Sequence, residues 1–137
     1  MVNAEDVSIG TALPSLVLPP ITRQTLAVYC GASGDHNPIH VDIDFAQESG
    51  LDDVIAHGML VMSYVGRALT SWVSPQLLKS FDSRFLKMTH VGDVITVSGV
   101  VVSKSRNDNK WLVDIELQAC DQENEIKISG KACIVLI

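Results

Sequence analysis

The sequence predicts a single α+β domain in which a curved antiparallel sheet wraps around one long buried central helix. Residues from about 57 to 73 are apolar on nearly every face, which is typical of a helix enclosed by protein. After residue 80 the apolar period changes from helical to two, so the second half is expected to form about four long strands. A buried helix followed by such strands favours a sheet that covers the helix.

The first third of the chain is expected to hold short elements. Residues 1–21 look irregular, and Thr22 suits the N-cap of a helix over about 23–32. A second, short helix is predicted further on, with Asp42 or Asp44 as its cap.

The strands of the second half are predicted to form an antiparallel meander. Residues 94–103 and 126–137 are rich in valine and isoleucine, and apolar residues alternate with polar ones over 111–120. Turn-forming residues lie between the strands: Gly92-Asp93, Asn107-Asp108-Asn109 and Gln122-Glu123-Asn124.

Length and composition fit one compact domain over residues 1–137. The chain is 47% apolar and 19% charged, and its net charge of −6 argues against general nucleic-acid binding. No run reaches the ~20 apolar residues of a membrane span, and the N-terminus lacks a signal pattern. We therefore expect a cytoplasmic protein without a membrane or nucleic-acid partner. Three cysteines without metal-type spacing predict reduced thiols: Cys30, Cys120 and Cys133.

A polar loop, Ser33-Gly34-Asp35-His36-Asn37-Pro38-Ile39-His40, is the main candidate for chemistry. Glycine and proline fix its backbone, so Asp35 and His40 can converge on one small volume. A carboxylate and an imidazole together can move protons at neutral pH. The structural alternative is that Asp35 and Asn37 only cap turns and that His40 is a buried, hydrogen-bonded side chain.

The loop resembles the signature of the MaoC-like family of R-specific enoyl-CoA hydratases and 3-hydroxyacyl dehydratases, which have the hotdog fold. The stretch from Tyr29 to His40 reads Tyr-x-Gly-x-Ser-Gly-Asp-x-Asn-Pro-Ile-His. The similarity continues through Asp44-Phe45-Ala46, Gly50-Leu51 and Ala56-His57-Gly58-Met59. The resemblance implies reversible hydration of trans-2-enoyl thioesters to (R)-3-hydroxyacyl thioesters in fatty-acid metabolism, by a hydro-lyase.

The resemblance also implies roles for individual residues. Asp35 and His40 would be the catalytic pair, and the backbone N–H of Gly58, at the start of the central helix, would bind the thioester carbonyl. A helix N-terminus suits an oxyanion because its N–H groups are unpaired. Asn37 and His57 would support the site. Ser63 would support the aspartate, although Gly66 competes for that alignment.

A basic stretch over 79–110 has six cations against three acids, whereas the first 78 residues hold only two cations. It is expected to be either a solvated strand face or an anion site. In the second case Arg84 and Lys87 would contact the phosphates of coenzyme A or of a carrier protein's phosphopantetheine.

No cofactor or metal is predicted, because coenzyme A or phosphopantetheine is part of the substrate. His36, His40 and His57 with Asp35 could mimic a metal cluster, but such a set is weak evidence for a metal. Two other functions stay open: a hotdog acyl-thioester hydrolase, or a non-catalytic subunit that binds acyl thioesters.

The expected partners are an acyl-thioester substrate, a second copy of the chain and possibly an acyl carrier protein. The apolar segment from Cys133 to Ile137 would be an aggregation-prone edge if it were bare, which favours a homodimer. A heterodimer with a sister hotdog subunit is the alternative.

Overall fold

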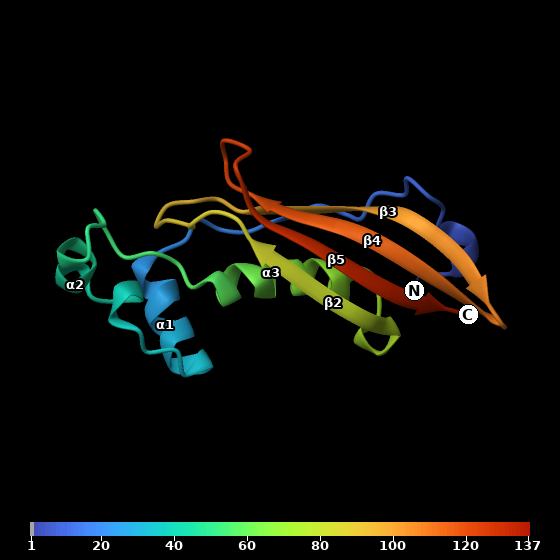
Figure 1. Cartoon of the computed structure of the whole chain (residues 1–137), viewed down its shortest axis with the longest axis horizontal. Coiled ribbons are helices and arrows are strands. Elements are labelled where there is room, and N and C mark those ends of the chain that lie inside the picture. Colours follow the sequence, from blue (N-terminus) through green and yellow to red (C-terminus); the bar gives the residue numbers. More distant parts are fainter. Residues whose placement is uncertain (1) are drawn as a thin grey trace.

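The structure is a computed structural model that describes residues 2–137. A five-stranded antiparallel sheet curves over helix α3, and two shorter helices gather at one end of the molecule (Figure 1). The elements, in chain order, are η1 Ala4–Asp6, β1 Leu16–Val17, α1 Arg23–Ser33, η2 Pro38–His40, α2 Ile43–Glu48, α3 Gly58–Trp72, η3 Pro75–Leu77, β2 Leu78–Phe85, β3 Thr96–Asn107, β4 Lys110–Cys120 and β5 Ile126–Leu136. No helix of the described part is long and apolar enough to cross a membrane.

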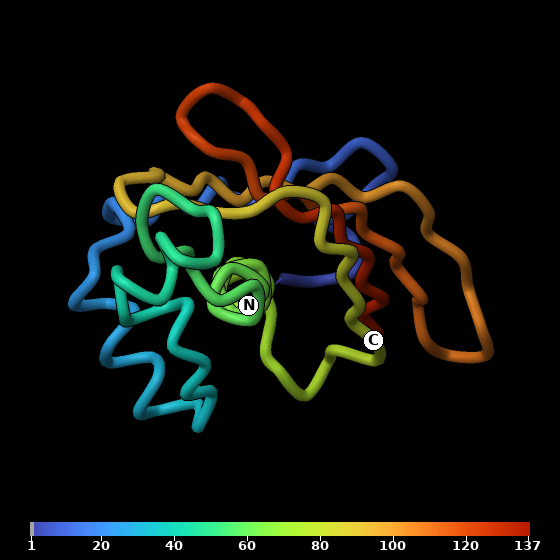
Figure 2. Tube along the Cα trace, turned by 60° about the vertical axis from the view of Figure 1, so that its left-hand side comes forward, coloured from blue at the N-terminus to red at the C-terminus, as the bar shows by residue number. Residues whose placement is uncertain are grey.

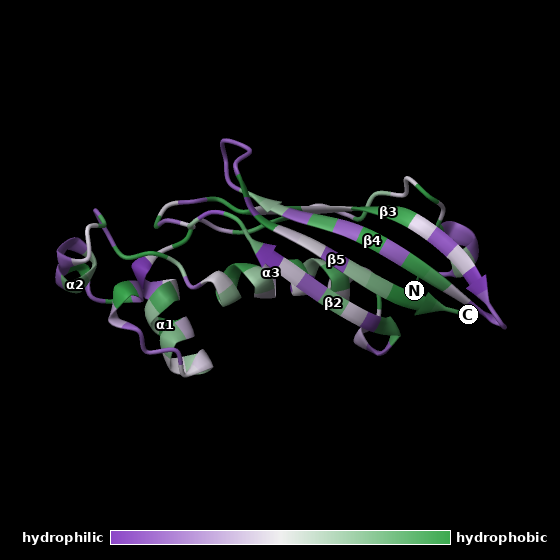
Figure 3. Cartoon of the chain, viewed as in Figure 1, coloured by the Kyte–Doolittle hydropathy of each residue, from purple (hydrophilic) through white to green (hydrophobic). Residues whose placement is uncertain are grey.

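The predicted α+β arrangement is confirmed: α3 lies under the arch of the sheet. Figure 2 shows α3 end-on with the strands curving over it. Along β4, buried Val113, Ile115, Leu117 and Ala119 alternate with more exposed residues, as the period of two predicts. The same alternation is visible as banding along β4 in Figure 3.

The strand order is β1-β3-β4-β5-β2, so the predicted meander is only partly right. Strands β3, β4 and β5 are neighbours in the order of the sequence. β2, however, does not pair with β3, which follows it in the sequence, but lies at the edge of the sheet and pairs with β5. This pairing corrects the expectation for the C-terminal segment. Cys133 and Ile134 of β5 pair with β4 on one side and with β2 on the other, and only Val135 and Leu136 pair with β4 alone, so β5 is an inner strand and not a bare edge. The C-terminal strand therefore gives no argument for a dimer.

The central helix is less enclosed than its composition predicts. Val61, Val65, Ala68 and Leu69 are buried under the sheet, and Leu60 is buried in a second cluster with Leu26 of α1 and Ala46 of α2. The opposite face is exposed in the single chain and includes Met59 at 55% exposure. The reason is geometric, because a sheet that curves over a helix covers one side of it.

Local capping follows the sequence closely. The Thr22 side chain accepts a hydrogen bond from Thr25 N at the start of α1. Asp42, not Asp44, caps α2 by accepting from the backbone N–H groups of Asp44 and Phe45. The stretch over 1–21, predicted to be irregular, contains η1 and the short strand β1, which pairs with β3.

The three cysteines are free thiols.

Candidate active site

The loop between α1 and α2 is built by short-range hydrogen bonds. Gly34 ends α1 in the left-handed conformation with φ of 75°, which glycine adopts without strain. Asp35 Oδ1 accepts from Asn37 N, and Asn37 Oδ1 accepts from Ile39 N. Asn37 therefore caps η2, and the turn-capping roles of the structural alternative are present.

The same turn brings Asp35 and His40 together. Asp35 Oδ2 lies 3.9 Å from His40 Nε2, which is too long for a direct hydrogen bond and suits a bridging water. The Asp35 side chain is 52% exposed, whereas that of His40 is 11% exposed. Capping uses one carboxylate oxygen and leaves the other facing the imidazole, so the two interpretations of Asp35 are compatible.

His40 has a defined tautomer. Its Nδ1 lies 2.7 Å from the carbonyl oxygen of Ile55. A carbonyl only accepts, so Nδ1 carries the hydrogen, and Nε2 of the neutral ring presents a lone pair toward Asp35. The pair thus has the geometry of a proton acceptor beside a carboxylate.

His57 joins the loop to the central helix. It is 1% exposed, stacks on His40 at a centroid distance of 3.7 Å, and meets Tyr29 edge-on at 4.8 Å. Its Nε2 lies 3.2 Å from the backbone oxygen of Asp35. Burial lowers the pKa of the His57 imidazole, against the opposing effect of that hydrogen bond. His57 is therefore a neutral support for both members of the pair.

Gly58, the next residue, is the first of α3. Its N–H has no acceptor within the helix, and the helix dipole places partial positive charge there. A Cβ atom on residue 58 would lie 3.1 Å from ring atoms of Phe85, so a larger residue would displace that ring. The helix start thus offers a backbone N–H donor to a developing negative charge, beside the Phe85 ring.

Gly58 and His40 line one cavity of about 440 Å³. Its wall is mainly apolar, with a few polar groups, which is the usual composition of a small-molecule site. The lining residues are His40, Ile55, Ala56, Gly58, Val61, Phe85, Leu86, Lys87, Met88, Thr89 and Ile128.

Ser63 does not reach the aspartate. Its hydroxyl donates to the Leu60 carbonyl oxygen, one turn earlier in α3. Within residues 2–137, no hydrogen bond joins Ser63 to Asp35. The supporting role predicted for Ser63 therefore has no hydrogen bond to carry it.

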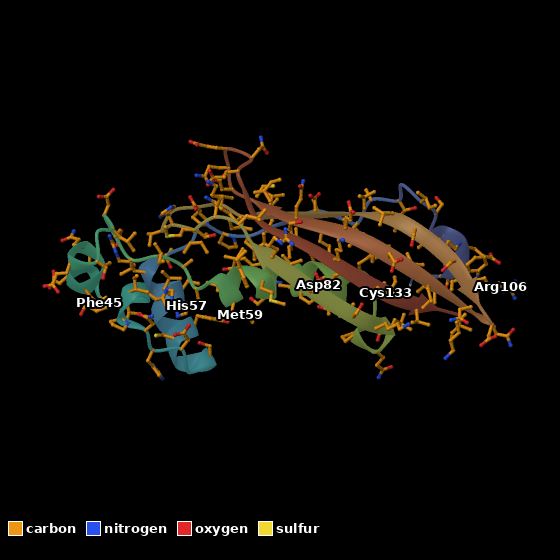
Figure 4. All side chains as sticks on the ribbon, in the orientation of Figure 1. Phe45, His57, Met59, Asp82, Arg106 and Cys133 are labelled. Atoms are coloured by element: carbon orange, nitrogen blue, oxygen red, sulfur yellow. The ribbon has the colours of Figure 1, made fainter. Side chains whose placement is uncertain are left out.

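The basic stretch does not form one site. Lys87 lines the cavity, but Arg84 precedes Phe85 in β2 and so projects from the opposite face of the sheet. Lys104 Nζ donates to the carbonyl oxygens of Ala4 and Val7, far from the cavity. Figure 4 shows Arg106 at the end of the molecule opposite His57. Of these cations, Lys87 is the one placed to meet a ligand in the cavity.

One ligand-type atom each from Asp35, His40 and His57 lies within 4.8 Å of the others. His36 is exposed and is not part of this group. The expectation that the site uses no metal stays a prediction.

A buried ionic cluster, which was not predicted from the sequence, lies behind the cavity wall. Lys127 is 2% exposed, and its Nζ lies 2.6 Å from Glu125, 3.1 Å from Asp121 and 3.8 Å from Asp93. The Lys127 carbonyl accepts from the N–H groups of Leu86 and Lys87. The cluster therefore fixes the start of β5, which carries Ile128 of the cavity wall and holds Leu86 and Lys87 by hydrogen bonds. The acids at 121, 123 and 125, close to one lysine, were the signal in the sequence.

Burial disfavours the charged form of Lys127, but hydrogen bonds to Glu125 and Asp121 and the charge of Asp93 outweigh it and raise the pKa of the ammonium. Burial likewise opposes ionisation of Asp121, but the N–H groups of Glu125 and Glu123 and the Lys127 ammonium hold its pKa below the usual range. Both shifts favour the charged forms, so Lys127 and Asp121 form an ion pair at neutral pH.

Comparison with known proteins adds independent information. Residues 8–122 match the family model described as "MaoC like domain". A mitochondrial 3-hydroxyacyl-[acyl-carrier-protein] dehydratase of Arabidopsis thaliana is 26% identical over 116 residues, covering 84% of this chain and 70% of that protein. An (R)-specific enoyl-CoA hydratase of Rhodospirillum rubrum is 26% identical over 134 residues, covering 96% and 90%. The chain spans about two thirds of the length of the plant relatives that it matches.

The fold is also found among solved structures. The (R)-hydratase from A. caviae superimposes with a TM-score of 0.82 at 22% identity, and the match covers 98% of this chain and 99% of that chain. The curled sheet over a central helix is therefore the hotdog fold that the resemblance implied. Since the family model covers most of the sequence, including the loop and the start of α3, the chain belongs to the MaoC-like domain family.

Proposed function

We propose that this chain catalyses the reversible hydration of trans-2-enoyl thioesters to (R)-3-hydroxyacyl thioesters in fatty-acid metabolism. The observation that carries the proposal is the shared cavity. It places His40, whose Nε2 lies 3.9 Å from Asp35 Oδ2, on the same wall as Gly58, the first residue of α3. The relatives named as hydratase and dehydratase support the same reaction class.

The reaction needs an oxyanion site because water adds at C3 while negative charge develops on the thioester oxygen. The Gly58 N–H at the start of α3 suits that charge, and its position is fixed before the reaction begins. The missing side chain leaves room for the oxygen to approach the backbone.

Water activation falls to the loop. A water between Asp35 Oδ2 and His40 Nε2 gives up one proton to the pair and its oxygen to C3. The pair then returns a proton to C2, so the sum of the steps adds one water across the double bond. His57 holds the stacked imidazole and the Asp35 carbonyl, which keeps the two groups aligned.

The carrier of the acyl group would be recognised through phosphate. Lys87 is the cation on the cavity wall, and coenzyme A and phosphopantetheine both carry phosphate groups. Arg84, on the other face of β2, is left out of this proposal.

The functional form would be a dimer, either of two copies or of this chain and a sister subunit. The exposed face of α3 and the unpaired outer edge of β2 support this assignment. One structural neighbour is the ChsH1–ChsH2 complex from Mycobacterium tuberculosis, with a TM-score of 0.79 and 23% identity. Light scattering on the purified chain measures the state, and a monomer at micromolar concentration would contradict a homodimer.

The activity test uses the purified chain and crotonyl-CoA. Hydration removes the absorbance of the conjugated thioester, and chiral analysis should give the R product. A parallel assay for free thiol separates hydration from thioester hydrolysis. Thiol release without loss of the double bond would replace the proposal with the hydrolase alternative.

A further inference from the structure

Two phenylalanines of β2 lie against two glycines of α3. Ring atoms of Phe85 lie 3.1 Å from the Cβ position of Gly58, and Cε1 of Phe81 lies 3.6 Å from that of Gly66. Four strand residues and eight helix residues both span about 12–13 Å, so the two contacts are in register along the elements. Together they close the space between β2 and α3 at two points.

The two rings differ in their relation to the site. Phe85 lines the cavity together with His40 and Gly58, whereas Phe81 is outside the cavity wall in the described part of the chain. Phe85 is also 50% exposed, while Val61 and Ile128 on the same wall are each 1% exposed. Leu86 and Met88 on this wall are similarly exposed, at 45% and 53%, but Phe85 is the one whose ring lies against the Cβ position of Gly58.

We propose that Phe85 limits the length of the acyl chain, so that the cavity takes short-chain enoyl thioesters. This inference rests on the proposed function. A thioester oxygen bound at Gly58 N–H places the first carbons of the acyl chain beside the Phe85 ring, because that ring packs on the same glycine. A longer chain has to pass between α3 and β2, and the ring occupies that passage.

The distribution of polar groups agrees with this direction. His40, Lys87 and Thr89 are the polar side chains of the cavity, and the remaining lining is apolar. The thioester and its carrier belong at the polar groups. The acyl chain then belongs at Val61, Phe85 and Ile128, where hydrophobic burial favours it.

The test compares kcat/KM for crotonyl-CoA and trans-2-decenoyl-CoA. The wild type should prefer crotonyl-CoA, and Phe85→Ala should shift the ratio toward decenoyl-CoA by at least ~10-fold, the effect of small size changes in apolar pockets. Phe81→Ala is the matched control, because it removes the same ring from the same strand and face. Its ratio should equal that of the wild type.

The outcomes separate the two proposals. A wild type inactive on both thioesters overturns the proposed function, and the role of Phe85 with it. An active wild type that favours decenoyl-CoA, or an equal shift in Phe81→Ala, overturns only the role of Phe85. If Phe85→Ala does not fold, Phe85→Leu keeps an apolar side chain and repeats the comparison, and an unchanged ratio there also overturns it.

Discussion

The imidazole rings of His40 and His57 stack with 3.7 Å between centroids and 23° between planes. One ring belongs to the end of the polar loop and the other to the residue that precedes α3. The stack therefore connects the proton-transfer pair with the start of α3. A change in the charge of His57 would act on His40 and on the Gly58 N–H.

His57 should make stability depend on pH. Burial lowers the pKa of His57 in the folded chain. As the pH falls below about 6.5, His57 is therefore protonated more in the unfolded chain than in the folded chain, which favours unfolding. Stability from this group is present above that pH and is lost as the pH falls. His57→Phe keeps the stacking but cannot titrate, so its melting temperature should fall less between neutral and mildly acidic pH. His36→Gln, at an exposed histidine, should keep the wild-type slope, and an unchanged slope in His57→Phe would contradict the assignment.

Asp35→Asn and His40→Gln should each lower kcat by at least ~10²-fold while the chain stays folded. Asparagine can still accept from Asn37 N, so the turn survives but the carboxylate is lost. The double variant should be little worse than the poorer single one, since the two groups act as a unit. Asp42→Asn, at the cap of α2, is the control and should retain activity. Steady-state kinetics together with thermal melting decides between lost chemistry and lost folding.

Lys87→Glu should raise KM for enoyl-CoA and leave kcat nearly unchanged, because a phosphate contact is the same in the ground state and the transition state. Arg84→Glu makes the same charge reversal on the other face of β2 and should leave KM unchanged. Equal effects of the two reversals would mean that the overall field of the protein, not a contact in the cavity, binds the carrier.

Lys127→Met should lower the free energy of unfolding by about 3–5 kcal/mol, because it leaves buried Asp93 and Asp121 without their cation. Lys131→Met, at an exposed position of the same strand, should change it by at most about 0.5 kcal/mol. Chemical denaturation measures both values. A loss in Lys127→Met no larger than in Lys131→Met would show that the cluster contributes nothing to stability.

The cluster also has a pH signature. Asp121 has a lowered pKa, so its contribution is present above about pH 3.8 and is lost as the pH falls through the folded-state pKa. Lys127 has a raised pKa, so its contribution is complete below about pH 10.5 and is lost as the pH rises through the folded-state pKa.

What the sequence could predict was mostly local. The loop and the helix starts could be predicted because the residues that form them act over a short range: Gly34, Pro38 and the N-caps Thr22 and Asp42. The period of two predicts the strands, and the same period places Arg84 and Phe85 on opposite faces of β2.

The pairing of β2 with β5 was not predictable in this way. It joins Phe85 to Ile128, and the whole of β3 and β4 lies between these two residues in the sequence. No local sequence pattern specifies so distant a partner. The exposure of one α3 face depends on how far the sheet curves, which composition does not record.

The pairing of Phe85 with Ile128 has a consequence for biosynthesis. On the ribosome, α3 and β2 emerge before β3, β4 and β5, yet β2 has no partner until β5 is available. The cavity wall between Phe85 and Ile128 is therefore completed only when the last strand of the sheet has been made. A nascent chain stalled before Ile128 should be a strong target for chaperones and prone to aggregate, even though its catalytic loop is already complete.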